Sequence, residues 1–308
     1  MTTQTANANL NIDGKSWGLL ALLSLIWGGS FLFVGIAVKE LPALLIVLAR
    51  VGMAALILLP IHLIVLGRLP RNAKTWIACG GMSIMNNAIP FTLISWGQHH
   101  ITGGLASVVN ATTPMFATIF MALAAYEAIT MRKAIALVIG FVGVVILQGA
   151  DFSDLGNQTW GILAVAVASL FYGLSAPWSK KMLVGIPPLT TATCQLSLST
   201  LIMTAIVLLF ADPGQYAAAA PKTWAALLGL AAISTSLAYL IFFRIIERAG
   251  PSFVSLVTML VPVSAILLGY LFLGEALTMR EIIGALTIGS ALLIIDGKVL
   301  TWLGFNKF

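Results

Sequence analysis

Residues 114–135 read PMFATIFMALAAYEAITMRKAI, and residues 262–283 read PVSAILLGYLFLGEALTMREII. Aligned at a spacing of 148, the two stretches share eight identities in 22 positions, more than common hydrophobicity alone would produce. The identical pairs are Pro114 and Pro262, Ala117 and Ala265, Glu127 and Glu275, Ala128 and Ala276, Thr130 and Thr278, Met131 and Met279, Arg132 and Arg280, and Ile135 and Ile283. We therefore expect two related halves, with predicted boundaries of 16–150 and 155–298.

The composition places the chain in lipid. Of its 308 residues 60% are hydrophobic and only 8% are charged, and the mean hydropathy is +1.04. Such a chain has too few ionisable groups to cover the surface of a soluble domain of this length.

Apolar runs long enough to cross a hydrocarbon core of about 30 Å number ten, five in each half. They cover residues 17–38, 42–66, 75–97, 103–126 and 134–149, and then 160–179, 187–210, 223–243, 251–273 and 281–295. The runs are continuously apolar rather than alternating, which predicts helices and not a β-barrel. An odd number of crossings per half forces the second half to enter the membrane upside down. We predict an all-α integral membrane protein whose ten transmembrane helices form two inverted five-helix repeats around a central cavity, an architecture typical of secondary transporters.

The basic residues predict the orientation, because cytoplasmic flanks hold the excess of Lys and Arg. One side of the predicted topology carries Lys15, Arg68, Arg71, Lys74, Arg132, Lys133, Lys180, Lys181, Arg244, Arg248, Lys298 and Lys307, and the other side carries Lys39, Lys222 and Arg280. This distribution predicts that both termini are cytoplasmic. The net charge of +6 is thus a topology signal, and we expect no binding of nucleic acid, which would need a basic soluble face.

Prolines near the middle of three predicted helices each remove a backbone donor and displace the carbonyl four residues earlier. The prolines are Pro90, Pro114 and Pro262, and the freed carbonyls belong to Asn86, beside Asn87, to Asn110 and to Thr258. Irregular backbone at membrane depth is tolerated where it lines a cavity or is buried in protein. These residues are predicted to bind substrate; the alternative is that the prolines are simple kinks satisfied by neighbouring Ser or Thr.

Aromatic residues accompany glycine-rich turns at corresponding places in the two halves. Trp27-Gly28-Gly29-Ser30 in the first helix corresponds to Tyr172-Gly173-Leu174-Ser175 in the sixth. Trp178 and Tyr239 also lie deeper than the tryptophans at helix ends, which are typical membrane anchors. We predict that Trp27, Tyr172, Trp178 and Tyr239 face the cavity, where each offers a flat apolar face with one polar group.

Arg50 is the one ionised group that lies clearly inside an apolar run. It follows Pro42 by eight residues, which places it roughly 12 Å below the start of its helix. A charge at that depth normally faces the bundle interior or a wet cavity, and snorkelling to the outer interface is the alternative. Arg50 is therefore a possible charged cavity residue.

The helices lack other chemistry-bearing groups. No Asp or Glu falls in the central portion of any predicted helix, as an exporter of lipophilic cations would require, and Arg50 alone would not neutralise the phosphates of a nucleotide sugar. Cys79 and Cys194 lie within apolar runs without metal-ligand spacing. We expect a small neutral or zwitterionic substrate, no metal, no cofactor and no enzymatic activity.

The two halves resemble the EamA repeats of the drug/metabolite transporter superfamily. The resemblance rests on the motif Trp27-Gly28-Gly29-Ser30-Phe31, on Pro114 and Pro262, and on the helix endings at Glu127 and Gly274-Glu275, and it covers residues 17 to 298. It implies an inner-membrane carrier whose cavity is formed by helices one, three, four, six, eight and nine. Cavity residues on those helices are then Trp27, Asn86, Asn87, Asn110, Tyr172, Trp178, Tyr239 and Thr258, whereas Arg50 lies on helix two.

Within this superfamily the chain looks most like the YddG-type exporters of aromatic and other neutral amino acids. An exporter of other drugs or metabolites, and a channel or structural helix bundle, remain the alternatives. Small residues four apart, Ala136 and Gly140 in the fifth helix and Ala285 and Gly289 in the tenth, predict close helix contacts either within one protomer or in a homodimer.

Overall fold

Each half of the chain repeats one order of helices. A computed structural model describes residues 13–148, 156–254 and 256–296, and every regular element in this part is helical. The first repeat contains α1 (Gly14–Ala37), α2 (Ala43–Leu66), α3 (Ala73–Met82), the π-helix η1 (Ser83–Ala88), α4 (Ile89–Gly97), α5 (Gly103–Asn110), α6 (Thr113–Leu123) and α7 (Met131–Gln148). The second contains α8 (Asn157–Met182), α9 (Pro188–Phe210), α10 (Gln215–Ala218), α11 (Pro221–Ala231), the π-helix η2 (Ala232–Leu237), α12 (Ala238–Ala249), α13 (Pro251–Val254), α14 (Val257–Leu273) and α15 (Met279–Asp296).

All ten predicted segments fall on these helices. Seven continuous helical runs of the described residues are long and apolar enough to cross a membrane: Gly14–Ala37, Ala43–Leu66, Ala73–Gly97, Gly103–Leu123, Gln158–Met182, Pro188–Phe210 and Pro221–Ala249. The remaining three predicted segments correspond to α7, α13 with α14, and α15. The prediction of an all-α membrane protein built from two repeats is confirmed.

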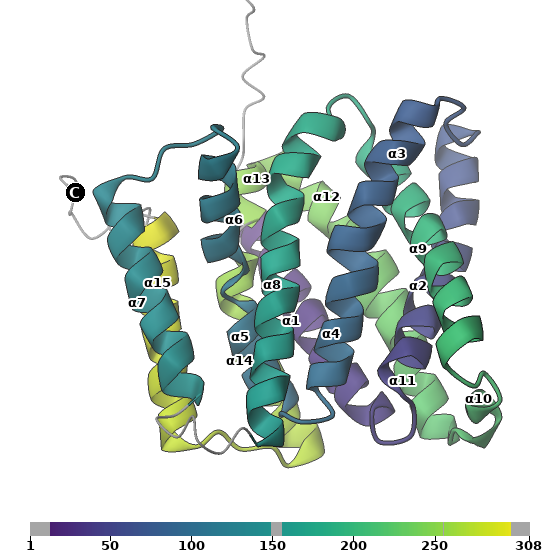
Figure 1. Cartoon of the computed structure of the whole chain (residues 1–308). Helices are drawn as coiled ribbons and strands as arrows, with labels where there is room; N and C mark the ends of the chain where they lie inside the picture. Colours follow the sequence, from purple (N-terminus) through teal and green to yellow (C-terminus); the bar gives the residue numbers. More distant parts are fainter. Residues whose placement is uncertain (1–12, 149–155, 255, 297–308) are drawn as a thin grey trace, which may run out of the picture.

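The two repeats run in opposite directions. We call the end of the bundle at which α1 begins the N-face. α4 ends at the opposite face, where the backbone of Gly97 meets Gly161 near the start of α8: a Cβ added to Gly161 would lie 3.0 Å from the Gly97 carbonyl oxygen. α8 therefore begins at the face where α1 ends. In Figure 1 α3 lies above α4 and the equivalent pair is reversed, with α12 above α11.

The described basic residues follow this geometry. The N-face carries Lys15, Arg68, Arg71, Lys74, Arg132, Lys133, Lys180, Lys181, Arg244 and Arg248, and the opposite face carries Lys39, Lys222 and Arg280. Lys298 and Lys307 lie outside the described residues. Because Arg132 and Arg280 begin equivalent helices of inverted repeats, they lie at opposite faces, which explains why Arg280 departs from the general asymmetry.

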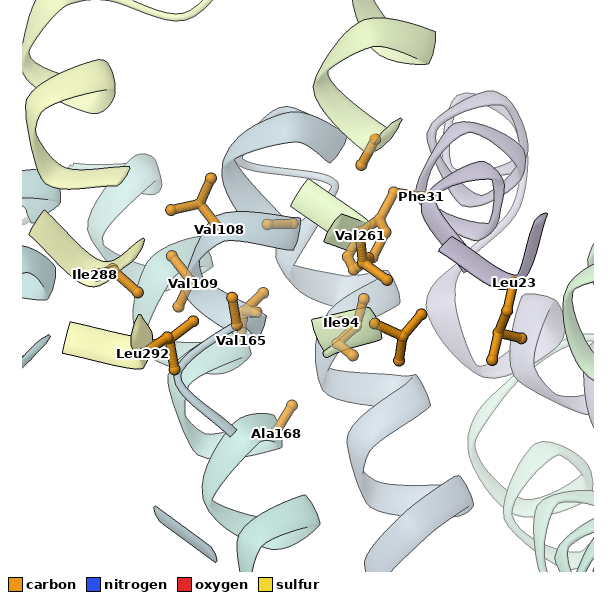
Figure 2. Close-up of a cluster of buried hydrophobic side chains, with 14 of the residues drawn as sticks. Leu23, Phe31, Ile94, Val108, Val109, Val165, Ala168, Val261, Ile288 and Leu292 are labelled. Atoms are coloured by element: carbon orange, nitrogen blue, oxygen red, sulfur yellow. The ribbon is translucent and has the colours of Figure 1, made fainter. Parts of the chain in front are cut away.

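A buried apolar cluster joins the two repeats (Figure 2). Its side chains come from helices of both repeats and include Leu23, Phe31, Ile94, Val108, Val109, Val165, Ala168, Val261, Ile288 and Leu292. Lipid is as apolar as these side chains, so close packing rather than escape from a polar solvent holds membrane helices together. The cluster therefore depends on shape complementarity between the two halves.

The pair α7 and α15 packs at one side of the bundle (Figure 1). Gly143 and Gly284 form the crossing: a Cβ added to either would lie 3.1 Å from the carbonyl oxygen of the other. Gly140 also packs within the protomer, against Met115, whereas nothing lies within 4 Å of a Cβ added to Gly289. The contact at Gly140 is thus internal, and a homodimer stays a prediction.

The loops at the opposite face join the repeats through Glu40. Its Oε2 accepts hydrogen bonds from the backbone N–H of Ala220 and from the hydroxyl of Thr223, each at 2.8 Å. These bonds, the one from Ala220 being the stronger influence, hold the pKa of Glu40 below its ordinary value of 4.5. The charged carboxylate is therefore the form that stabilises the folded protein.

The substitution Gly143→Ala is expected to destabilise the protein, because the added methyl group meets backbone atoms that cannot move aside independently. Overpacking of this kind costs about 1–3 kcal/mol, and the melting temperature in detergent should fall. Gly289→Ala is the matched control in the same helix pair, with unchanged or slightly raised stability, since alanine favours helix by up to about 1 kcal/mol over glycine. Equal effects of the two changes would contradict the described crossing.

Acid should remove the contribution of Glu40 to the stability of the folded protein. A depressed pKa in the folded state stabilises the protein above the unfolded pKa, and this stabilisation is lost as the pH falls through the folded pKa. Glu40→Gln is expected to lower the melting temperature at pH 7, and the curves of wild type and variant should converge below about pH 4. A difference in melting temperature between wild type and variant that stays constant from pH 7 to pH 3 would show that the charge of Glu40 does not stabilise the protein.

Candidate functional site

Arg50 lies at the junction of the two repeats. Its α2 side chain is only 8% exposed, and its Nε donates a 3.1 Å hydrogen bond to the hydroxyl of Thr235 in η2. The guanidinium carbon lies 3.6 Å from the centroid of the Phe91 ring, a cation–π contact. The snorkelling alternative is wrong for this structure, because the side chain is buried and held inside the bundle by Thr235 and Phe91.

A π-helical turn positions Thr235. Such turns insert one extra residue into an α-helix and often occur at functional sites. In η2 the hydroxyls of Thr235 and Ser236 donate to carbonyls five residues earlier, those of Leu230 and Ala231, at 2.8 and 3.0 Å. The hydroxyls thereby satisfy backbone acceptors of the widened turn.

The π-helix η1 occupies the corresponding place in the first repeat and packs against α9. Ser83 donates from its hydroxyl to the Gln195 carbonyl at 2.9 Å, and Asn87 Nδ2 donates to Ser199 Oγ at 3.1 Å. On the other side of the pseudo-symmetry axis Ser236 of η2 donates to the Ala54 carbonyl of α2 at 3.5 Å. Each π-helix therefore anchors its repeat to the other one.

Tyr239 is held by a polar contact and has a neighbour from the other repeat. Its hydroxyl accepts a 2.6 Å hydrogen bond from Gln195 Nε2, and the side chain of Asn86 lies beside it. Its ring stacks on Phe243, with centroids 5.9 Å apart. We call the set formed by Arg50, Asn86, Phe91, Tyr172, Gln195, Thr235 and Tyr239 the Arg50 centre.

The structure brings together three of the eight predicted substrate-binding residues, namely Asn86, Tyr172 and Tyr239, and adds Arg50 to them. Each of the three is half-buried, so part of its surface stays accessible inside the bundle. With Gln195, the Arg50 centre joins one cation, two phenol groups and two amides within a largely apolar environment.

The other predicted residues have different surroundings. Trp27 packs on Phe242, with ring centroids 5.6 Å apart, and Asn87 is fully buried toward α9. Trp178 Nε1 donates to the Ala78 carbonyl at 2.9 Å, and its ring covers Gly81. These contacts hold helices together.

The two residues placed beside the prolines of the repeat also have partners. The Asn110 carbonyl accepts a 2.8 Å hydrogen bond from the Thr113 hydroxyl, as the simple-kink alternative predicted, and the segment breaks into α5 and α6 at Ala111 and Thr112. Thr258 is half-buried near the start of α14 and makes a polar interaction of its own. Substrate binding by these residues stays a prediction.

The predicted substrate-binding set did not include Phe91, Thr235 or Gln195, which the structure adds to the centre. One signal was available for Gln195, which follows Pro187 by eight residues just as Arg50 follows Pro42. Aligning the two prolines places Arg50 and Gln195 at equivalent depths of α2 and α9. Phe91 had no signal of its own among many apolar residues.

The described cavities lie away from this centre. One of about 510 Å³ opens at the opposite face and is lined by residues that include Gly35, Lys39, Gln98, His100 and Glu275. A shallow apolar depression of about 460 Å³ follows the outside of α14. The predicted central cavity therefore stays a prediction.

The described residues contain no cluster of His, Cys, Asp and Glu suited to a metal ion, and Cys79 and Cys194 are buried free thiols.

The duplicated glutamates make unequal contacts. Glu275 of the second repeat accepts hydrogen bonds from the backbone N–H groups of Gly103 and Gly104 at 3.2 and 3.3 Å, which caps the first turn of α5 in the first repeat. A carboxylate at a helix N-terminus is favoured by the helix dipole. Its counterpart Glu127 instead binds Lys133 of its own repeat at 2.8 Å. The two duplicated glutamates thus differ, because Glu275 binds the other repeat and Glu127 binds its own; the cross-repeat carboxylate contact at the N-face is instead the 3.0 Å ion pair of Asp13 with Arg248.

These features define a multi-pass helical membrane protein of transporter type, with two inverted repeats that meet at a buried polar centre. Residues 15–148 and 159–295 each match the EamA-like transporter family, and the chain belongs to that family. It is a membrane transporter and not an enzyme.

Relatives extend over nearly the whole chain. An uncharacterized transporter of Archaeoglobus fulgidus is 25% identical over 271 residues, covering 88% of this chain and 95% of its own. The uncharacterized inner membrane transporter YedA of Escherichia coli K12 is 23% identical, with 86% and 85% covered. A crystal structure of a protein shares the fold, with a TM-score of 0.65 at 15% identity, and covers 96% of this chain and 100% of its own.

Proposed function

We propose that this protein is a secondary carrier that exports small neutral or zwitterionic metabolites by alternating access, with aromatic and other neutral amino acids as its substrates. The main support for this proposal is that both inverted repeats contribute residues to one buried centre. Arg50 from the first repeat donates to the Thr235 hydroxyl of the second at 3.1 Å, and beside it Gln195 of the second repeat donates to the Tyr239 hydroxyl at 2.6 Å. When the two repeats rock against each other, a site that they share becomes accessible first from one side of the membrane and then from the other.

The moving halves are residues 16–150 and 155–298. The unequal contacts of the two duplicated glutamates support this motion, because inverted repeats exchange conformations when the transporter changes the side to which it opens. Glu275 joins the repeats at the opposite face by binding α5, beside the cavity that it helps to line, while Glu127 is paired with Lys133 at the N-face. In the other state Glu127 would release Lys133 and Glu275 would release α5.

The chemistry of the centre supports the substrate class. Tyr172, Tyr239 and Phe91 provide aromatic surface, and Asn86 and Gln195 provide amides that bind a carboxylate or an ammonium group. The described helices contribute no carboxylate to this centre, which disfavours lipophilic cations. Other drugs or metabolites handled by the same superfamily are the second candidate class, and a YddG-type assignment rests on this composition alone.

The membrane placement follows from the basic residues. The excess of Lys and Arg at the N-face favours that face as the cytoplasmic one, with the protein in the inner membrane of a bacterium and both termini in the cytoplasm.

Counterflow in proteoliposomes tests the carrier assignment against a channel or a structural bundle. Liposomes loaded with unlabelled L-phenylalanine should transiently accumulate labelled L-phenylalanine, with saturation at rising concentration. Tyr239→Ala should reduce the rate by roughly tenfold or more, because hydrogen bonds to charged groups contribute about 1.5–3 kcal/mol, and Asn110→Ala tests the predicted role of Asn110. Tyr270→Ala, on the lipid-facing side of α14, is the matched control and should transport normally. Flux without saturation or counterflow would indicate a channel.

Removing the Glu275 contact should loosen the opposite face. In Glu275→Ala the first N–H groups of α5 lose their carboxylate acceptor, so a cysteine introduced at His100 should react faster with a membrane-impermeant maleimide. Glu127→Ala is the control at the equivalent position and should leave the His100 cysteine unchanged in this state. Equal labelling rates in the Glu275 variant and its parent would refute the proposal that Glu275 holds the opposite face together.

A further inference from the structure

Arg50 is a buried cation without a carboxylate. The ion pairs among the described residues are Lys133–Glu127, Arg244–Glu247 and Arg248–Asp13. All three lie near the ends of helices, whereas Arg50 lies at the depth of the membrane interior. Arg50 keeps only 8% of its surface exposed. It contacts the hydroxyl of Thr235 and the ring of Phe91, and Tyr172 and Tyr239 pack against the buried cluster to which Phe91 belongs.

These neighbours compensate the charge only in part. A guanidinium carries five N–H donors, and the hydrogen bond to Thr235 uses the Nε group alone. The Phe91 contact uses the flat face of the guanidinium and leaves its edge free for a planar acceptor. A charge buried at membrane depth is expensive unless it is paired or serves the transport pathway.

The geometry favours one particular anion. A single guanidinium forms two parallel hydrogen bonds with one carboxylate, a geometry that lysine cannot reproduce. Phosphate-rich ligands need several cations, and Arg50 is the one Lys or Arg that the described residues place inside the bundle.

The two repeats also differ at this point. Gln195, which is equivalent to Arg50 in the second repeat, is neutral and already donates to Tyr239. A ligand in the centre therefore meets a cation on the α2 side and neutral amide and phenol groups on the α9 and α12 side. The centre has a charged end and a neutral end, as a small organic acid or amino acid has.

We propose that Arg50 is the receptor for the substrate's carboxylate, and that the ligand class of this transporter is a small molecule with one carboxylate and an apolar or aromatic remainder. The inference rests on the proposed carrier function and deepens it by assigning the anion-binding residue. The guanidinium edge holds the carboxylate, while Phe91, Tyr172 and Tyr239 contact the remainder.

The stability of the unliganded protein provides a first test that needs no substrate. Arg50→Met removes a charge that the protein does not pair, so the melting temperature in detergent should stay equal or rise. Arg50→Gln is the second variant in case methionine disturbs folding, and Arg244→Met, an arginine with a 64% exposed side chain, is the control that should change nothing. A fall of several degrees in both Arg50 variants would show a paired, structural arginine and overturn the proposal.

A ligand series with one side chain provides the decisive test. Thermal shift is measured with L-phenylalanine, with 3-phenylpropionate, which lacks the ammonium group, and with phenylalanine amide, which lacks the carboxylate. The wild type should bind the two acids roughly tenfold or more tightly than the amide, because hydrogen bonds to charged groups are strong. Arg50→Gln should lose this preference, and Arg50→Lys should restore it only partly.

Acetate, the smallest carboxylate, makes the test independent of the side chain. It should stabilise the wild type at high concentration and leave Arg50→Gln unaffected. Acetate stabilisation without counterflow of any amino acid would refute the carrier function and leave the anion site standing. Normal counterflow in Arg50→Gln, or an unchanged preference for the acids, would refute the anion site and leave the carrier standing.

Discussion

The structure depends on one constraint, which is that a polar group inside lipid must find its partner within the protein. The π-helices obey it through hydroxyls that return to backbone carbonyls five residues earlier, as Thr235 and Ser236 do. The buried first turn of α5 obeys it through Glu275 of the other repeat. Arg50 obeys it only in part, and for that reason it is the residue at which a ligand would contribute most.

Duplication with inversion turns equal sequences into unequal environments. Glu127 and Glu275 occupy the same position of the repeat, yet one lies at the N-face on Lys133 and the other at the opposite face on α5. Arg50 and Gln195 occupy equivalent depths of α2 and α9 and still differ in charge. A single conformation cannot treat the two faces alike, which is the structural condition for a transporter that opens to one side at a time.

Glycine contacts hold the inverted halves close enough for this centre to form. Gly97 and Gly161 bring α4 against α8, and Gly143 and Gly284 bring α7 against α15. In lipid such close approach replaces the hydrophobic effect as the source of helix association. The buried apolar cluster in Figure 2 fills the remaining space between the repeats.

The sequence by itself determined the ten helices, their inverted order and the depth of Arg50, because apolar length, the repeat spacing and the positions of basic residues are local properties of the chain. It also predicted Asn86, Tyr172 and Tyr239, which the structure places near Arg50, as substrate-binding residues, and that role stays a prediction. Only the tertiary structure decided that Asn87 turns toward α9, that Thr113 satisfies the Asn110 carbonyl, and that Gln195 and Phe91 join the centre. The physical reason is that the direction of a side chain in a π-helix and its partner on another helix depend on how the two repeats pack, and no local pattern records that packing.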